Sequence, residues 1–180
     1  MLALAGLAGA AAQTPPSPGV SVTSAQSANP GPMRPAVEPK ELSGMLTAQN
    51  AVRSHLNLSR LIWSAELSDR ATETANATTG RTCGKTGALR VGEAAGAAVY
   101  WAPPMRMFAG GDTAQEISSS YLVSEWQVGA TDYDAKTQQC RKGGVCMSYA
   151  RLVDPEVRAV GCARKLCDSQ AQIWVCHYGR

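Results

Sequence analysis

The pattern of apolar and polar positions predicts helices in the first half of the chain and strands in its last third. One helix is expected from Ser43, acting as its N-cap, to about Leu56. A second helix is expected to begin after Trp63, with Ser64 as its cap. Its inner side holds apolar and small residues at four-residue steps, namely Leu67, Ala71 and Ala75. Small residues at these positions would let the helix lie close to its neighbour.

The glycine-rich stretch that follows, residues 81–112, is expected to be mostly loop. A third helix is predicted to begin at Thr113, because Thr113 and Glu116 have the spacing of a capping box, in which each side chain satisfies an unpaired backbone amide. We expect this helix to end near Gln127. Its inner side would hold Ile117, Tyr121 and Leu122.

Three short runs near the C-terminus have the composition of β-strands and are bounded by Gly, Asp or Pro. They span Cys146–Val153, Arg158–Arg164 and Gln172–Tyr178. An antiparallel sheet of this kind has an apolar face that another layer must cover. The predicted helices can supply that layer, so the pattern indicates an α+β domain.

The cysteines indicate an oxidising compartment. The chain has six, an even number, and five of them lie between Cys140 and Arg180. Six cysteines allow fifteen pairings, and the sequence pattern does not choose among them. Residues 1–12 are apolar and small and end in Ala10-Ala11-Ala12, so we expect the remnant of a secretory signal peptide. Because no Lys or Arg precedes this run, a flexible Ala-rich tail is the alternative. We expect a secreted or periplasmic protein.

Composition divides the chain into a linker and one domain. Residues 13–40 are rich in Pro, Ser, Gly and Ala and hold seven of the ten prolines, so they are predicted to be a disordered linker. Residues 41–180 are then expected to form a single domain, and a monomer. The net charge is only +3 without a basic run, which disfavours nucleic acid as a partner. No stretch reaches the length of a transmembrane helix.

Several motifs resemble the CAP superfamily, which comprises cysteine-rich secretory proteins, antigen five and pathogenesis-related proteins of class one. The resemblance covers roughly residues 42–178. The matching segments are Ala48-Gln49-Asn50-Ala51-Val52-Arg53, Gly92-Glu93, the spacing of Trp126, Tyr133 and Cys140, and Gly161-Cys162-Ala163-Arg164. Cys146-Met147-Ser148-Tyr149 lies where Cys-Gly-His-Tyr is usual, and Cys176-His177-Tyr178 replaces Cys-Asn-Tyr. The cysteine spacing and the Gly-Cys-Ala-Arg motif are the most specific of these.

The resemblance implies a disulfide-stapled, three-layer α-β-α sandwich with a small antiparallel sheet. It also implies a set of disulfides. Following the pattern of the plant members, the pairs would be Cys83–Cys167, Cys140–Cys146 and Cys162–Cys176. The first pair would tie the loop after the second helix to the sheet.

The family also implies a cleft with two His and two Glu, which holds a divalent metal in several members. Here Gly87 and Ser148 stand at the two His positions, Gly129 stands at the second Glu position, and only Glu93 matches. Zinc needs three or four converging donors. We therefore expect no metal, no cofactor and no enzymatic activity. The two histidines, His55 and His177, are expected to be a helix-end and a strand-end residue.

The remaining candidate ligand cleft would consist of Glu93, Ser148, Gly129 and Tyr149. Its small residues predict a roomier and less charged cleft than the family's. Glu93 is expected to have a structural role, accepting backbone amides or pairing with a cation. Ser148 would be a nucleophile only with a base beside it. Strand alternation would place Ser148 on one face with Ala150 and Leu152.

An apolar loop is the second candidate site. It consists of Tyr100, Trp101, Met105, Met107 and Phe108. These side chains either plug the edge of the core or stay exposed, where they would contact a ligand, membrane or partner. The first functional hypothesis is a non-catalytic secreted CAP protein that binds a lipid or another small apolar ligand. The alternatives are a cell-surface protein-interaction module, with residues 13–40 as spacer, and a peptidase-like enzyme.

Overall fold

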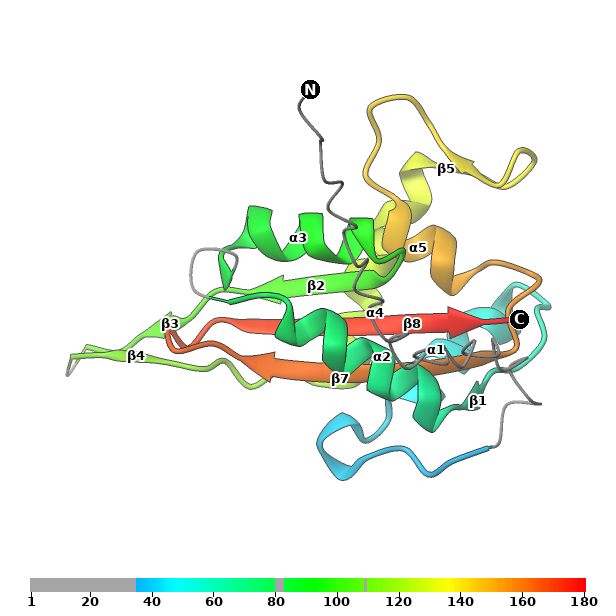
Figure 1. Cartoon of the computed structure of the whole chain (residues 1–180). Helices are drawn as coiled ribbons and strands as arrows, with labels where there is room; N and C mark the ends of the chain where they lie inside the picture. The colour runs from blue at the N-terminus through cyan, green and yellow to red at the C-terminus, as the bar shows by residue number, and fades with distance from the viewer. Residues whose placement is uncertain (1–34, 80–82, 109) are drawn as a thin grey trace, which may run out of the picture. The chain divides into compact units, whose positions relative to one another are not determined.

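A four-stranded sheet with strand order β1-β7-β8-β2 forms the centre of the domain (Figure 1). The computed structural model describes residues 35–79, 83–108 and 110–180. Strands β7 (Ala159–Leu166) and β8 (Gln172–Gly179) form a long antiparallel hairpin, which confirms the last two predicted strands. Strand β2 (Ala98–Ala102) pairs antiparallel with β8, and β1 (Ile62–Trp63) pairs parallel with β7.

Helices cover both faces of this sheet. Helices α2 (Ala65–Asn76) and α3 (Lys85–Ala94) pack on one face. Their alanines contact Val99, Ile173 and Val175 from the sheet. Helices α1 (Met45–His55) and α4 (Ser119–Gln127) contribute to the core on the opposite face. The domain is therefore the α-β-α sandwich that the resemblance implies.

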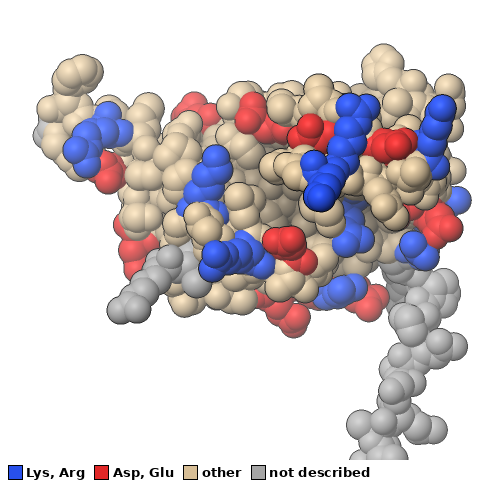
Figure 2. Space-filling view, turned by 90° about the horizontal axis from the view of Figure 1, so that it is seen from above, with Lys and Arg blue, Asp and Glu red and all other residues tan. Residues whose placement is uncertain are grey.

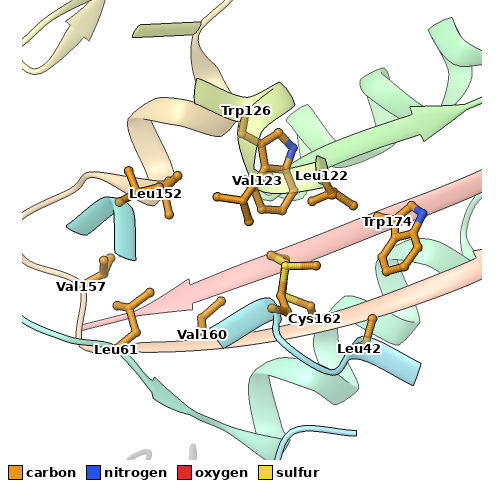
Figure 3. Close-up of a cluster of buried hydrophobic side chains, with 14 of the residues drawn as sticks. Leu42, Leu61, Leu122, Val123, Trp126, Leu152, Val157, Val160, Cys162 and Trp174 are labelled. Atoms are coloured by element: carbon orange, nitrogen blue, oxygen red, sulfur yellow. A yellow bond between two sulfur atoms is a disulfide. The ribbon is translucent and has the colours of Figure 1, made fainter. Parts of the chain in front are cut away.

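The two cores differ in the size of their side chains. The core under α1 and α4 contains three tryptophans, Trp63, Trp126 and Trp174, together with the Cys162–Cys176 disulfide. Figure 3 shows Trp126, Trp174 and Cys162 together in this cluster. The core under α2 and α3 is built mainly from Ala, Val and Ile. Gly161 of β7 explains how α2 comes so close, because a Cβ there would collide with the backbone of Leu67 and Ser68. Only glycine fits beneath this helix.

The N-terminal boundary of the domain is earlier than composition predicts. Helix α1 has Gly44 as its N-cap, not Ser43, and Gly44 offers no side-chain oxygen. The carboxylate of Glu38 replaces it, accepting from the amides of Gly44 (3.0 Å) and Leu46 (2.7 Å). Pro35 also pairs with the edge of the sheet at Ser64. Residues 35–40 thus belong to the domain, which corrects the predicted linker. The predictions for residues 1–34 lie outside the described residues.

The prediction for α2 is confirmed, and the one for residues 81–112 is wrong. The Ser64 hydroxyl caps α2 by accepting from the amide of Leu67 (3.3 Å). Helix α3, strand β2 and the small hairpin of β3 (Met105–Arg106) and β4 (Asp112–Thr113) occupy most of the predicted loop. The glycines misled the prediction because Gly92 faces Val99, where a Cβ would collide with its side chain. That glycine marks close packing, not a loop.

The third helix begins later than the capping box predicts. Thr113 belongs to β4, and α4 begins at Ser119 with the Ser118 hydroxyl accepting from the amide of Tyr121 (3.1 Å). The predicted end at Gln127 is confirmed. Leu122 is fully buried and Ile117 packs against the core, as expected, but Tyr121 is exposed.

Residues Cys146–Val153 form a helix instead of the predicted strand. Helix α5 spans Met147–Leu152. It follows the 3-10 helix η3 (Val128–Asp132) and the hairpin of β5 (Tyr133–Asp134) and β6 (Gln139–Cys140). Short apolar runs do not distinguish a strand from a buried helical turn. Inferences from strand alternation around Ser148 are therefore void.

Three disulfides connect these elements, with the pairing that the resemblance implies. Cys83–Cys167 spans 84 residues, Cys162–Cys176 joins β7 to β8, and Cys140–Cys146 ties β6 to the start of α5. In the chain-entropy treatment, closing the longest of these loops contributes about 4.5 kcal/mol. Within the described ranges, no helix is long and apolar enough to cross a membrane.

A buried arginine joins α1 to the end of α5 and the loop that leads into β7. Arg53 is fully buried, and its guanidinium donates to the carbonyl oxygens of Ser59, Leu152, Asp154 and Val157 at 2.8–3.1 Å. Desolvation by burial lowers the pKa of Arg53 from its ordinary value. The four carbonyls compensate a charge that is otherwise costly to bury.

Candidate functional site

The segments that carry the candidate cleft positions meet at the backbone of Val99. Gly92 of α3 packs directly on the Val99 side chain. The indole of Trp126, from α4, donates to the carbonyl oxygen of Val99 (3.1 Å). Ser148 of α5 contacts the same residue. Helices α3, α4 and α5 therefore all contact Val99 of β2, which is an edge strand of the sheet.

Ser148 satisfies the free edge of β2. Its hydroxyl accepts from the amide of Val99 (3.1 Å) and donates to the carbonyl oxygen of Val99 (3.3 Å). The side chain thus pairs with the backbone as a neighbouring strand would. Because the hydroxyl already donates one hydrogen bond and accepts another within the fold, Ser148 is a poor nucleophile.

The prediction of a roomier cleft is wrong at Gly129. A Cβ at this position would lie 3.0 Å from Cα of Cys146, 3.1 Å from Cβ of Tyr149 and 3.2 Å from the carbonyl oxygen of Val145. The chain entering α5 fills the space that a glutamate side chain would need. The small residue therefore allows close packing of η3 against α5 and does not open a cavity.

The other two candidate residues are divided between surface and core. Glu93 lies on α3 with an exposed side chain, and its carboxylate has no hydrogen bond or ion pair with any residue in the described ranges. Its expected structural partner is therefore missing from that part of the chain. Tyr149 is partly buried and packs edge-on against Tyr133, with 5.4 Å between the ring centroids. It acts as a packing residue.

The two histidines lie far apart in the fold. His55 is the exposed last residue of α1. His177 is buried in β8, not at the strand end as expected, and its Nε2 lies 2.8 Å from the hydroxyl of Thr74. Burial, and then the charges of Arg70 and Arg151, lower the pKa of His177. The ring is therefore neutral at pH 7.

The residues at the family's cleft positions do not fit a metal ion. Gly87 and Gly129 have no donor, and the Ser148 hydroxyl is bonded to Val99. Elsewhere, no three His, Cys, Asp or Glu side chains in residues 35–79, 83–108 and 110–180 are grouped as metal ligands would be. We derive no metal chemistry for this cleft.

The apolar loop divides into a packed half and an exposed half. In β2, the Trp101 indole donates to the carbonyl oxygen of Cys83 (2.8 Å), and Tyr100 packs edge-on against Tyr121. These contacts place Tyr100 and Trp101 at the edge of the core. Three residues on the β3–β4 hairpin are exposed instead, with relative solvent accessibilities of 45% for Met105, 49% for Met107 and 114% for Phe108. Figure 2 shows this hairpin extending from the left of the body.

Two surface pockets are lined by a mixture of polar and apolar side chains. One, of about 300 Å³, lies between the β5–β6 hairpin and α5 and includes Tyr133, Gln138 and Asp154. The other, of about 340 Å³, lies beside the Cys83–Cys167 disulfide and includes Lys165 and Asp168. Sequence reasoning missed both pockets, because their residues come from separate segments of the chain.

Helices on both faces of a small sheet, fastened by three disulfides, define the class: a stapled α-β-α sandwich. Residues 46–178 match the Cysteine-rich secretory protein family, CAP. The chain belongs to this family. A "Pathogenesis-related protein PR-1 type" from Sambucus nigra is 32% identical over 63 residues, which are 35% of this chain and 38% of that protein. The match thus spans well under half of the relative's length.

Solved structures show the same fold at low identity. The hookworm platelet inhibitor has a TM-score of 0.57 and 13% identity, covering 83% of this chain and 74% of its own. The venom allergen-like protein 4 of Schistosoma mansoni has a TM-score of 0.52 and 16% identity, covering 78% of this chain and 88% of its own. At these identities the likeness concerns the fold alone.

Proposed function

We propose that this protein is a secreted or periplasmic, non-catalytic CAP-domain protein that binds lipid through its β3–β4 hairpin. The observation that carries the proposal is the exposure of Met105, Met107 and Phe108 together on one projecting hairpin. Six cysteines, all paired, support the extracellular or periplasmic location.

The non-catalytic part of the proposal rests on how the cleft residues are used. General acid–base catalysis needs two groups with separated pKa values in one cleft. At the four family positions, Gly87 and Gly129 carry no such group, and the Ser148 hydroxyl holds β2. Glu93 is then a single exposed carboxylate. An isolated group of this kind supports binding or solubility better than hydrolysis.

The hairpin has the chemistry of a lipid-contacting element. Its apolar side chains sit beside Arg106, whose side chain is 88% exposed and 3.6 Å from the Asp112 carboxylate. Flexible methionines and an aromatic ring can enter the acyl region of a lipid surface while an arginine contacts head groups. Exposed apolar groups gathered in this way mark interaction sites.

A lipid surface suits this hairpin better than a folded protein partner. A stable protein interface buries about 800 Å² on each partner, with a complementary surface. Three side chains on a narrow hairpin offer far less area. Insertion into lipid requires no complementary shape, so a few side chains are sufficient.

Vesicle co-sedimentation tests the proposal. The full chain, with its disulfides oxidised, is mixed with vesicles of phosphatidylcholine and phosphatidylglycerol and centrifuged. We expect the wild type to sediment with the vesicles and the double variant Met107→Ser/Phe108→Ser to lose at least nine tenths of that binding. Val37→Ser is the matched control, because Val37 is 92% exposed but lies outside the hairpin. A double variant that binds like the wild type, or a wild type that stays in solution, contradicts the proposal.

A further inference from the structure

The outer face of α5 carries a pocket that is separate from the candidate cleft. Met147, Ala150 and Arg151 line it at helical spacing, on a different side of α5 from Ser148. The β5–β6 hairpin forms the opposite wall. The volume is about 300 Å³, at the small end of ligand pockets.

The lining of this pocket is a dense mixture of hydrogen-bond donors and acceptors. Asp154 supplies a carboxylate, Gln138 and Gln139 supply amides, Tyr133 supplies a phenol, and Arg151 balances the acidic charge. Met147 adds an apolar surface. Burial, followed by the charge of Asp154, raises the pKa of Tyr133, so that its hydroxyl remains a donor at neutral pH.

Contacts of the β5–β6 hairpin hold the pocket in shape. The Cys140–Cys146 disulfide ties the hairpin to the start of α5. The Asp134 carboxylate accepts from the amide of Lys136 (2.8 Å) and so fixes the hairpin turn. Tyr133 is held by its edge-on contact with Tyr149. A preformed site loses little conformational entropy when a ligand binds.

Gln138 has an unfavourable backbone conformation at the pocket wall. Its φ is +56°, in the left-handed region, where glycine is the least costly residue. Strained non-glycine residues concentrate at binding sites. Glutamine at this turn position sacrifices backbone stability and places an amide in the pocket lining.

We propose that this pocket binds one sugar unit of a neutral saccharide. Adjacent hydroxyls of a sugar both donate and accept, which matches the amides, phenol and carboxylate, and its C–H surface suits Met147. Asp154 and Arg151 carry opposite charges within the lining, and Arg180, 4.0 Å from the Asp154 carboxylate, is itself paired with Glu156 at 2.8 Å. The lining therefore has no net charge that would select an anion or a cation. The inference is independent of lipid binding by the hairpin.

The test is calorimetric titration of the full, oxidised chain with cellobiose, maltose, lactose and chitobiose. We expect at least one of these to bind. Gln138→Gly should raise its Kd at least tenfold while the fold gains stability, because the variant removes the amide and relieves the left-handed strain. Gln170→Gly is the matched control: Gln170 also has a positive φ, 63°, but lies in the β7–β8 turn. Its Kd should stay within twofold of wild type.

A second variant and a second class of probe complete the test. The side chain of Asp154 accepts a hydrogen bond from the amide of Glu156 (2.8 Å), and Asp154→Asn keeps an oxygen for that bond. The variant removes the negative charge and so weakens the acceptor offered to the sugar. The Kd should therefore again rise tenfold. The proposal is overturned if none of the four disaccharides binds, or if Gln138→Gly and Gln170→Gly have equal Kd. Binding of inorganic phosphate or glucuronic acid alone would reassign the pocket to anions and also overturn it.

Discussion

The candidate cleft and the β3–β4 hairpin use their side chains in opposite ways. At the cleft, polar and small residues are consumed by the fold: Ser148 bonds to the Val99 backbone, and Gly129 lies against the chain entering α5. On the hairpin, Met107 and Phe108 contact solvent. Residues at the family's cleft positions therefore have structural roles here. Apolar residues of the kind that usually form a core are instead exposed on the hairpin.

The difference predicts which substitutions change the stability of the fold and which do not. Changes at a packed, hydrogen-bonded position alter the free energy of unfolding, because they create overlap or leave a buried group unpaired. Changes of exposed apolar residues leave it nearly unchanged. An apolar group kept in water without a stability benefit is better explained by binding.

The largest effect is expected from restoring the family's glutamate. Gly129→Glu should destabilise the fold by about 1–3 kcal/mol, because its Cβ would lie 3.0–3.2 Å from atoms of Val145, Cys146 and Tyr149, which would have to shift to make room. Urea denaturation measures the change. Ala130→Glu, at the exposed next residue, is the control and should change stability by less than about 0.5 kcal/mol. Equal stability of the two variants would show that the cleft has room after all.

A smaller loss is expected from Ser148→Ala. The variant leaves the amide of Val99 without its acceptor at the edge of β2, which costs about 1–2 kcal/mol. Ser54→Ala, on the exposed side of α1, should be neutral within about 0.5 kcal/mol. If Ser148→Ala were as stable as Ser54→Ala, the hydroxyl would be free for another role.

A pH-dependent effect is expected from His177. Because its pKa in the folded state is below 6.5, the unfolded chain binds the proton more tightly. The neutral ring's contribution is complete above pH 6.5 and is lost as pH falls below that value toward the folded-state pKa. Urea midpoints at pH 7.5 and 5.5 should therefore fall more in wild type than in His177→Gln, which keeps a partner for Thr74. His55→Gln should behave like wild type, and a His177→Gln variant with an unchanged slope would refute the assignment.

The smallest effect on stability is expected at the hairpin. Phe108→Ala should change the free energy of unfolding by less than about 0.5 kcal/mol, since the ring is fully exposed. Thermal unfolding of the variant beside wild type measures this. A loss above 1 kcal/mol would place the ring in the core and remove the contrast with the cleft.

The sequence predicted elements where one local rule was sufficient. Strands β7 and β8 have strand composition and clear turn boundaries, and α2 has both a serine cap and alanines at helical steps. The motifs that resemble the CAP family implied the sandwich and the three disulfides. Helix α5 was missed because six residues are too few for a period to distinguish helix from strand. Helix α3 was missed because Gly92, required by contact with Val99, resembles a loop residue.

The sites depended on contacts that sequence spacing does not reveal. Nothing local indicates that Ser148 pairs with Val99, 49 residues away, or that Glu38 caps α1. The glycine at position 129 suggested empty space, because the sequence does not show that the chain entering α5 packs against it. The pocket beside α5 combines Tyr133 and Gln138 of the β5–β6 hairpin with Asp154, which follows α5, and the Cys140–Cys146 disulfide ties that hairpin to α5.

Native-state hydrogen exchange at the amide of Val99 tests the central claim most directly. If Ser148 closes the cleft as the geometry indicates, this amide exchanges only through large-scale opening, with a protection close to that of the β7–β8 ladder, and Ser148→Ala abolishes the protection. Exchange in wild type as fast as at the exposed Phe108 amide would mean that the cleft is open and the contrast with the hairpin does not hold.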